Sequence, residues 1–225
     1  AGGEFTPPDT RPDGTIDEGD GEPDPVPDPN DFTGAYLVSV SDSDDPTGTW
    51  TNYRIPPLQG DPPSPVQKVN GNTPTLGLVD FPQLGYGPDA VYLTQNFFEL
   101  TPEGSFLFTG ATMEILDKSD LYDGEDVSTL HFTGLENADG SLAFTSQPAK
   151  QPTRASDDDA FYLMNTRFFQ GKTLTVWEVT DPTDVNNVSV TNDSVRVRPY
   201  HNPPGAKQPD TEEKIDMGDT RIVDS

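Results

Sequence analysis

The chain has 225 residues, of which 39 are Asp or Glu and 13 are Lys or Arg, so its net charge is −26. This charge repels nucleic acids and anionic membranes, and we expect neither as a partner. The chain contains no Cys, which excludes disulfides, thiolate zinc sites and cysteine nucleophiles. No stretch of about 18 consecutive apolar residues occurs, so membrane insertion is not expected.

The acidic residues are mainly Asp, with 28 Asp against 11 Glu. A hydrated Asp-rich surface is typical of a halophilic or marine secreted protein. Carboxylate oxygens are also the ligands that Ca²⁺ prefers, so Ca²⁺ is the one cofactor that the composition suggests. The two interpretations are not exclusive.

Residues 1–32 differ in composition from the rest of the chain. They hold seven Pro, seven Asp and five Gly, with Arg11 as the only base. Such a segment cannot bury enough apolar surface to fold alone, and Pro favours extended backbone. We interpret it as an acidic Pro/Gly-rich linker or arm that precedes a folded region over residues 33–225.

Short runs of Val, Tyr, Phe, Thr and Leu recur after residue 33 between clusters of Gly, Asp and Pro, which predicts strands joined by turns. Helical periodicity is limited to one possible turn at Lys118–Tyr122. The fold class is therefore all-β. The predicted strands are Ala35–Ser41, Trp50–Ile55, Ala90–Phe98, Ala111–Asp117, Ser128–Phe132, Ala160–Phe168, Thr173–Val179 and Val188–Val197.

An internal repeat joins two of these strands. The sequence DAVYLTQNFF from Asp89 is similar to DAFYLMNTRFF from Asp159, and each is followed by two further predicted strands. A short antiparallel meander with two apolar faces is typical of a β-propeller blade, which is stable only against neighbouring blades. The pattern predicts a partial propeller of about three four-stranded antiparallel blades.

The segment SDSDDPTGTW from Ser41 to Trp50 resembles the Asp-box, S-x-D-x-G-x-T-W, of sialidase-like and BNR-repeat propellers. The resemblance implies a structural turn rather than a catalytic site. Its carboxylates accept bonds from turn N–H groups, its Gly permits an unusual backbone angle, and its Trp packs under the turn. The residues concerned are Asp42, Asp44, Gly48 and Trp50.

A wider pattern resembles secreted bacterial and archaeal β-propeller proteins, mostly of unassigned function. Its motifs are D-F-P-x-L-G, D-A-x-Y-L-T-x-N and a late Q-P…D-x-G-D-x-R. The resemblance implies an extracellular or cell-surface location. Since two and a half to three blades cannot close a ring, we expect the remaining blades to come from a second chain, a longer precursor or self-assembly. The matching positions are Asp80, Pro82, Leu84, Gly85, Asp89, Ala90, Tyr92, Thr94, Asn96, Gln208, Pro209, Asp216, Gly218, Asp219 and Arg221.

Several Asp residues are candidates for a metal site. Three adjacent carboxylates, Asp157, Asp158 and Asp159, repel one another unless they are hydrated or bind a cation. Four more begin strands in the family pattern, where they either bind a cation or make hydrogen bonds in turns: Asp80, Asp89, Asp216 and Asp219.

Three further features bear on catalysis or sugar binding: the histidines, a sialidase-like motif and a set of aromatic residues. His131 and His201, the only histidines, lie in different predicted blades, so no histidine-based catalytic site is expected. The sequence Tyr53-Arg54-Ile55-Pro56 resembles a sialidase motif but follows the Asp-box instead of preceding it, and is better interpreted as a strand end. Four aromatic residues could either form a platform for a sugar ring or belong to the core of a blade: Phe168, Phe169, Trp177 and Tyr200.

The first hypothesis is a secreted, non-catalytic binding or assembly module at the cell surface or in an extracellular structure, with Ca²⁺ as a stabilising ion and a glycan as a ligand. It assigns no catalytic residue. One alternative is a propeller-type polysaccharide-active enzyme, either a glycosidase or a lyase. The other is a subunit of an extracellular fibre whose arm docks on the next copy.

Overall fold

The structure is a computed structural model that describes residues 36–55, 77–101, 103–124, 126–153, 160–167, 170–218 and 220–222. The expected arm over residues 1–32 lies outside these ranges. So do four of the candidate metal residues: Asp157, Asp158, Asp159 and Asp219.

The described residues form two four-stranded antiparallel sheets, two two-stranded hairpins and one short helix, so the all-β class is confirmed. Two sheets are four-stranded, against the expected three or so. Sheet I contains β3 (Gly77–Tyr86), β4 (Ala90–Leu100), β5 (Phe106–Asp117) and β6 (Thr129–Leu135) in that order, with α1 (Lys118–Asp123) between β5 and β6. Sheet II contains β7 (Gln147–Pro148), β8 (Phe161–Thr166), β9 (Gln170–Thr180) and β10 (Ser189–His201).

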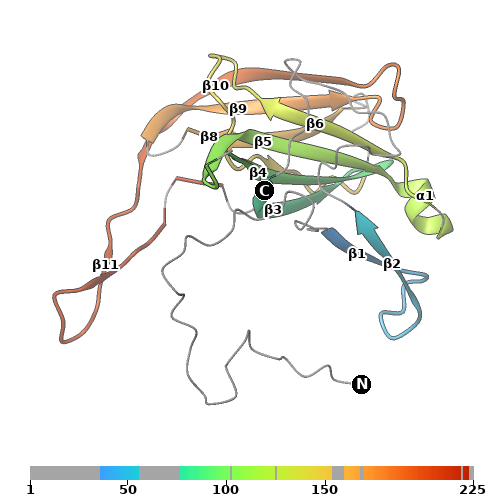
Figure 1. The fold of residues 1–225 in the computed structure, drawn as a ribbon, viewed down its shortest axis with the longest axis horizontal. Helices are drawn as coiled ribbons and strands as arrows, with labels where there is room; N and C mark the ends of the chain where they lie inside the picture. The colour runs from blue at the N-terminus through green and yellow to red at the C-terminus, as the bar shows by residue number, and fades with distance from the viewer. Residues whose placement is uncertain are drawn as a thin grey trace.

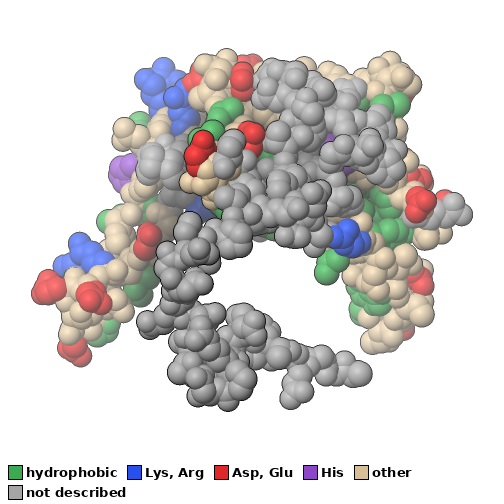
Figure 2. All heavy atoms as spheres, in the orientation of Figure 1, with side chains coloured by type: hydrophobic (Ala, Val, Ile, Leu, Met, Phe, Trp, Pro, Cys, Tyr) green, Lys and Arg blue, Asp and Glu red, His purple; other side chains and the backbone are tan. Residues whose placement is uncertain are grey.

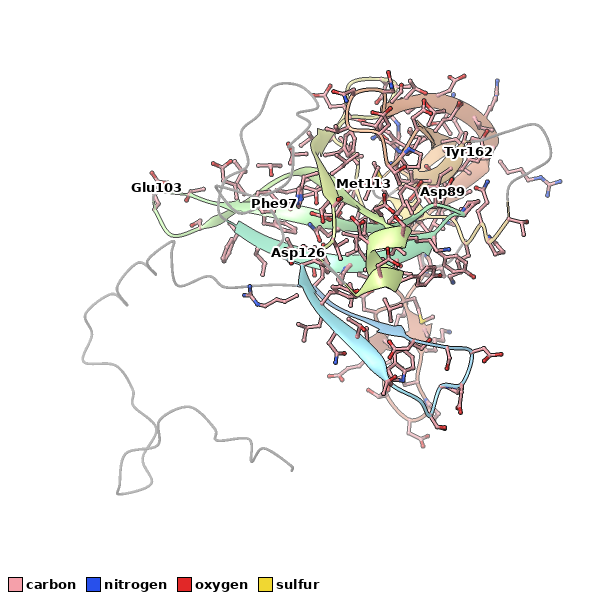
Figure 3. The ribbon with its side chains drawn as sticks, turned by 90° about the vertical axis from the view of Figure 1, so that its right-hand side faces the viewer. Asp89, Phe97, Glu103, Met113, Asp126 and Tyr162 are labelled. Carbon is pink, nitrogen blue, oxygen red and sulfur yellow. The ribbon has the colours of Figure 1, made fainter. Side chains whose placement is uncertain are left out.

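The two four-stranded sheets lie face to face (Figure 1) and enclose the main core. Alternate residues of β4 and β5 point into this core because successive side chains of a strand face opposite sides. Tyr92 of sheet I stacks on Phe161 of sheet II with ring centroids 3.5 Å apart. Met113 of β5 lies between the sheets and is fully buried (Figure 3).

The opposite face of sheet I packs against a hairpin of β1 (Tyr36–Ser41) and β2 (Trp50–Ile55). A second, smaller core joins them, with Leu93 and Leu116 of sheet I against Ile55 of the hairpin. The Tyr53 hydroxyl donates to the carbonyl of Leu121 at 2.7 Å and fastens the hairpin to α1. The remaining hairpin, β11 (Ala206–Lys207) and β12 (Lys214–Ile215), projects away from the sheets (Figure 1).

Strand β3 was not predicted because it contains Pro82, which cannot donate to a ladder. The structure accommodates Pro82 in an irregularity between Asp80 and Gln83, where pairing with β4 shifts register. The expected helical turn is confirmed: α1 begins after Asp117, whose carboxylate accepts from the Ser119 N–H, and ends at Gly124 with φ 74°.

Sheets I and II also touch along β3 and β7. The Tyr86 N–H donates to the Ala149 carbonyl at 3.1 Å, and the Gln151 N–H returns a bond to the Tyr86 carbonyl at 2.8 Å. A Cβ added at Gly85 would come within 2.4 Å of the Ala149 carbonyl oxygen. Glycine at position 85 therefore permits the two backbones to meet.

No helix within the described ranges is long and apolar enough to cross a membrane.

Candidate functional site

A cavity of about 550 Å³ opens at one end of the interface between sheets I and II. This volume lies within the range of small-molecule and sugar sites. The cavity is formed by β3, the β4–β5 hairpin, residues 137–144 and the facing ends of β8 and β9. Its lining residues are Asp80, Phe98, Phe108, Asn137, Ser141, Leu142, Phe144, Thr166, Arg167 and Gln170.

Three phenylalanines form the apolar wall of this cavity. The ring of Phe108 lies 5.4 Å from that of Phe98 and 5.6 Å from that of Phe144, centroid to centroid. Both contacts are tilted or edge-to-face, which is the favoured geometry for aromatic pairs. All three side chains are half-buried. The three rings therefore support one another, and their exposed parts offer an apolar surface to a ligand.

A buried hydrogen-bond chain positions the loop that carries Phe144. The Trp177 indole N–H donates to Asn165 Oδ1 at 2.7 Å, and Asn165 Nδ2 donates to Asn137 Oδ1 at 2.8 Å. Asn137 Nδ2 in turn donates to Ser141 Oγ and to the Leu142 carbonyl. Because these side chains are almost fully buried, sheet II fixes the loop that closes the cavity.

The rim of the cavity is polar. Arg167 forms an ion pair with Asp139, and both side chains are substantially exposed. Thr220 Oγ1 donates to the Arg167 carbonyl and the Thr220 carbonyl accepts from Thr166 Oγ1, so Thr220 lies beside the cavity. Arg221 lies over the ring of Phe81, 4.4 Å from its centroid. Exposed Asp80, Arg167 and Gln170 provide acceptors and donors next to the apolar wall.

The aromatic residues considered from sequence have other positions. Trp177 is 3% exposed and lies in the main core. The Tyr200 hydroxyl donates to the Thr173 carbonyl and accepts from the Arg167 N–H, so it fixes the end of β8. Phe168 and Phe169 lie outside the described residues. Phe98 and Phe108 are cross-strand partners in the β4–β5 hairpin, and tertiary packing brings Phe144 to them from a separate segment.

A second cavity of about 540 Å³ lies at the opposite end of the strands, beside α1. Three Asp residues line it: Asp89, Asp117 and Asp181. Figure 3 places Asp89 at this end and Glu103, at the tip of the β4–β5 turn, at the other. Lys118 Nζ, which donates to the Gly87 carbonyl, supplies an opposite charge here.

The described candidate metal residues are spread over the molecule. Asp80 lines the aromatic cavity, Asp89 lines the second cavity, and Asp216 accepts from the Gly218 N–H in an exposed turn. Within the described ranges, no three His, Cys, Asp or Glu side chains group closely enough to hold a metal ion. Calcium binding by these residues remains a prediction. Acidic side chains occupy several separate places on the surface shown in Figure 2.

The Asp-box-like segment forms the turn between β1 and β2. The Asp42 carboxylate accepts from the hydroxyls of Thr49 and Thr51. Asp45, which the motif did not single out, accepts from the N–H and hydroxyl of Thr47, and these bonds lower the pKa of its carboxyl. Asp44 is exposed.

The two other motif residues also take part in this turn. The Gly48 N–H donates to the Asp45 carbonyl at 3.0 Å. Trp50 donates from its indole to the Pro46 carbonyl at 3.2 Å while remaining 46% exposed. The hydrogen bonds of this segment serve the turn itself.

Two residues of the D-A-x-Y-L-T-x-N motif anchor the segment that leads into β7. Thr94 Oγ1 donates to the Ser146 carbonyl at 2.5 Å. Asn96 exchanges two bonds with Thr145, whose φ of 49° lies in the left-handed region. The motif therefore fixes an unusual backbone between the two sheets.

A buried polar cluster on the other face of sheet I was not predicted. Glu114 is 0% exposed, His131 is 3% exposed, and Glu114 Oε1 lies 3.8 Å from His131 Nδ1. Burial raises the pKa of the Glu114 carboxyl, although His131 and Gln95 oppose the shift. Burial, with a contribution from the Glu114 charge, also raises the pKa of Tyr36. The sequence signal that could have revealed this cluster is the position of Glu114 between Met113 and Ile115 in an otherwise apolar strand.

No family model, no curated protein and no solved structure matches this chain.

Proposed function

We propose that the chain is a secreted, non-catalytic binding module built from β-propeller blades, and that it binds a glycan in the aromatic cavity. The observation that carries this proposal is the wall of Phe98, Phe108 and Phe144 beside a polar rim, in a cavity of about 550 Å³. A sugar ring has an apolar C–H face and a periphery of hydroxyls. The C–H face suits the negative face of an aromatic ring, and the hydroxyls suit carboxylate, amide and guanidinium groups.

The way in which the sheets stack supports the blade interpretation. The β4 and β8 repeats occupy the second position of sheets I and II respectively. In sheet I, Val91 and Leu93 face the preceding hairpin, and in sheet II their repeat equivalents, Phe161 and Leu163, face sheet I. Each sheet thus presents the same positions to its predecessor, as blades around an axis do. Further blades from a second chain, a precursor or another copy would extend the stack.

Binding fits the cavity better than catalysis does. Glycoside hydrolysis normally needs two carboxyl groups on either side of one sugar bond. Among the described residues that line the cavity, Asp80 is the single carboxylate, and the Asp139 carboxylate on the rim is paired with Arg167. Glu114, whose pKa is raised, lies on the far face of sheet I, away from this cavity.

A glycan array followed by calorimetric titration with the best ligand tests the proposal. Phe108→Ala removes the central ring of the wall, and we expect it to weaken binding about tenfold or more, as the loss of a buried aromatic contact predicts. Phe106→Ala is the matched control, because Phe106 is also on β5, is 44% exposed and does not line the cavity.

A variant on the cavity rim tests the same site in case Phe108→Ala fails to fold. Gln170→Ala leaves the aromatic wall intact and should also weaken binding, while the thermal transition stays that of the wild type. Equal affinities for all four proteins would contradict the assignment of the cavity. Release of new reducing ends or unsaturated sugar products would favour the enzyme alternative.

A further inference from the structure

The described residues form two complete four-stranded sheets and two hairpins of two strands each. Figure 1 shows these elements as an arch, with sheets I and II across its top and the hairpins β1–β2 and β11–β12 extending in the same direction from its opposite ends. The β1–β2 hairpin packs on sheet I, whereas β11–β12 projects from the body. Each hairpin has half the number of strands of a complete sheet.

Chain order shows which half of a sheet each hairpin represents. In sheets I and II the strands are neighbours in chain order, and the fourth strand of sheet I, β6, leads to the first strand of sheet II, β7. By the same rule, β1–β2 leads to β3 and corresponds to a third and fourth strand. The β11–β12 hairpin follows β10 and corresponds to a first and second strand. The two halves are therefore complementary.

A short sequence repeat supports this assignment of β11. The residues Ala149-Lys-Gln-Pro152 continue from β7, and the same four residues recur as Ala206-Lys-Gln-Pro209, beginning with β11. In sheet II the Ala149 N–H donates to the Tyr162 carbonyl of β8, so this segment extends the first strand of that sheet. Thus β11 carries the sequence of a first strand, and within the described ranges it pairs with β12 alone.

Apolar side chains are exposed at both ends of the stack of sheets. Leu37 of β1 alternates with Tyr36 and Val38, which pack towards sheet I, so Leu37 faces away from that sheet. Its exposed fraction of 82% is the highest of any large apolar side chain in the described ranges. The outer face of sheet II carries Val176, which is half-buried, and its neighbour Val195, which is 47% exposed. Blades pack face to face, so a preceding blade would cover Leu37 and a following blade would cover the valines.

The β11–β12 hairpin is a weak unit by itself. Lys207 and Lys214 are direct cross-strand partners, and like charges directly opposite each other destabilise a pair of strands. A two-stranded hairpin is marginally stable in water unless further strands or a packing surface support it. Its pairing with two more strands would give the composition of sheets I and II.

We propose that two copies of this chain close a six-bladed ring, in which β11–β12 of each copy pairs with β1–β2 of the other to form a four-stranded sheet. The inference rests on the blade architecture of the proposed function. One chain supplies two complete blades and two halves, which is fewer than the four to eight blades of typical rings. Two copies related by a two-fold axis give six blades and leave no half unpaired. The two hairpins extend in the same direction, so two arches can meet end to end (Figure 1).

The mass of the full chain in solution tests the ring. Sedimentation equilibrium is run in about 1 M salt, where a Debye length of about 3 Å screens the repulsion between two copies of charge −26. We expect twice the chain mass of 24.4 kDa. Leu37→Asp buries a charge at the joint and should weaken the dimer about tenfold or more. Leu107→Asp is the matched control, because Leu107 is 58% exposed on sheet I, away from both hairpins.

Cross-linking locates the joint without any substitution. In an antiparallel meander the turns after the first and third strands lie at the same end, which places Lys207 and Lys214 beside the turn that follows β1. After carbodiimide treatment of mixed ¹⁵N-labelled and unlabelled protein, we expect links between chains from these lysines to Asp42, Asp44 or Asp45.

Two results would overturn the ring: a single-chain mass at high salt, and a dimer whose links between chains leave out β1–β2. A single chain would assign the remaining blades to a different polypeptide. The glycan titration is carried out on the same samples. A single chain that still binds the glycan overturns the ring and leaves the proposed binding site standing, so the two failures are distinguishable.

Discussion

At the scale of single residues, Glu114 is the most unusual group in the described structure. Its carboxyl is completely buried, and burial raises its pKa above the ordinary value of 4.5. A raised pKa means that the folded state holds this proton more tightly than the unfolded chain does. Stability from this group is therefore complete below pH 4.5 and is lost as the pH rises through the folded pKa.

Glu114→Gln should remove this pH dependence. We expect the free energy of unfolding of the wild type to fall, relative to the variant, as the pH rises above 4.5. Urea denaturation of both proteins over a pH series measures this difference, and the shared background of the other acidic residues cancels. A difference that stays constant with pH would show that Glu114 is not buried as described.

At the scale of elements, the contact between β3 and β7 joins the two sheets. Gly85 lies where the backbones meet, and an added Cβ would come within 2.4 Å of the Ala149 oxygen and 2.6 Å of Pro148 Cβ. The oxygen belongs to the backbone and the Cβ to a proline ring, so neither can rotate away. The sequence pattern singled out Gly85 without explaining why a glycine is needed there. The close approach of the two backbones explains it.

Gly85→Ala should separate the sheets along this edge. Overpacking of this kind costs about 1–3 kcal/mol of unfolding free energy. Chemical denaturation measures the loss, with Leu84→Ala as the control, since Leu84 is 47% exposed and its truncation should cost less than about 0.5 kcal/mol. Equal stabilities of the two variants would contradict the close approach.

The sequence predicted most strands because alternating apolar residues report one buried face, as in β1 and β2. It did not predict β3, where Pro82 is absorbed by a register shift, or β7, which is two residues long. The aromatic cavity could not be predicted either. Phe98 and Phe108 pair within the β4–β5 hairpin, but Phe144 and the rim residues join them only through tertiary packing, which spacing along the chain does not encode.

At the scale of the whole molecule, a net charge of −26 coexists with cores between stacked sheets. Apart from Glu114, the Asp, Glu, Lys and Arg side chains of the described residues are not buried, while the interfaces between sheets hold aromatic and aliphatic side chains together with buried amides. Asn137 and Asn165 link the sheets at the cavity, and an amide network specifies one arrangement more strictly than apolar contacts do. The cavity is therefore a property of the stacked pair of sheets.

The most direct test of a glycan site between the sheets is backbone amide NMR during titration with the glycan selected on the array. We predict that shift changes concentrate on the residues that line the aromatic cavity, with the glycan recovered unchanged; these residues are Asp80, Phe98, Phe108, Asn137, Ser141, Leu142, Phe144, Thr166, Arg167 and Gln170. Changes centred on Asp89, Asp117 and Asp181 at the opposite end would contradict the account, and so would a cleaved glycan.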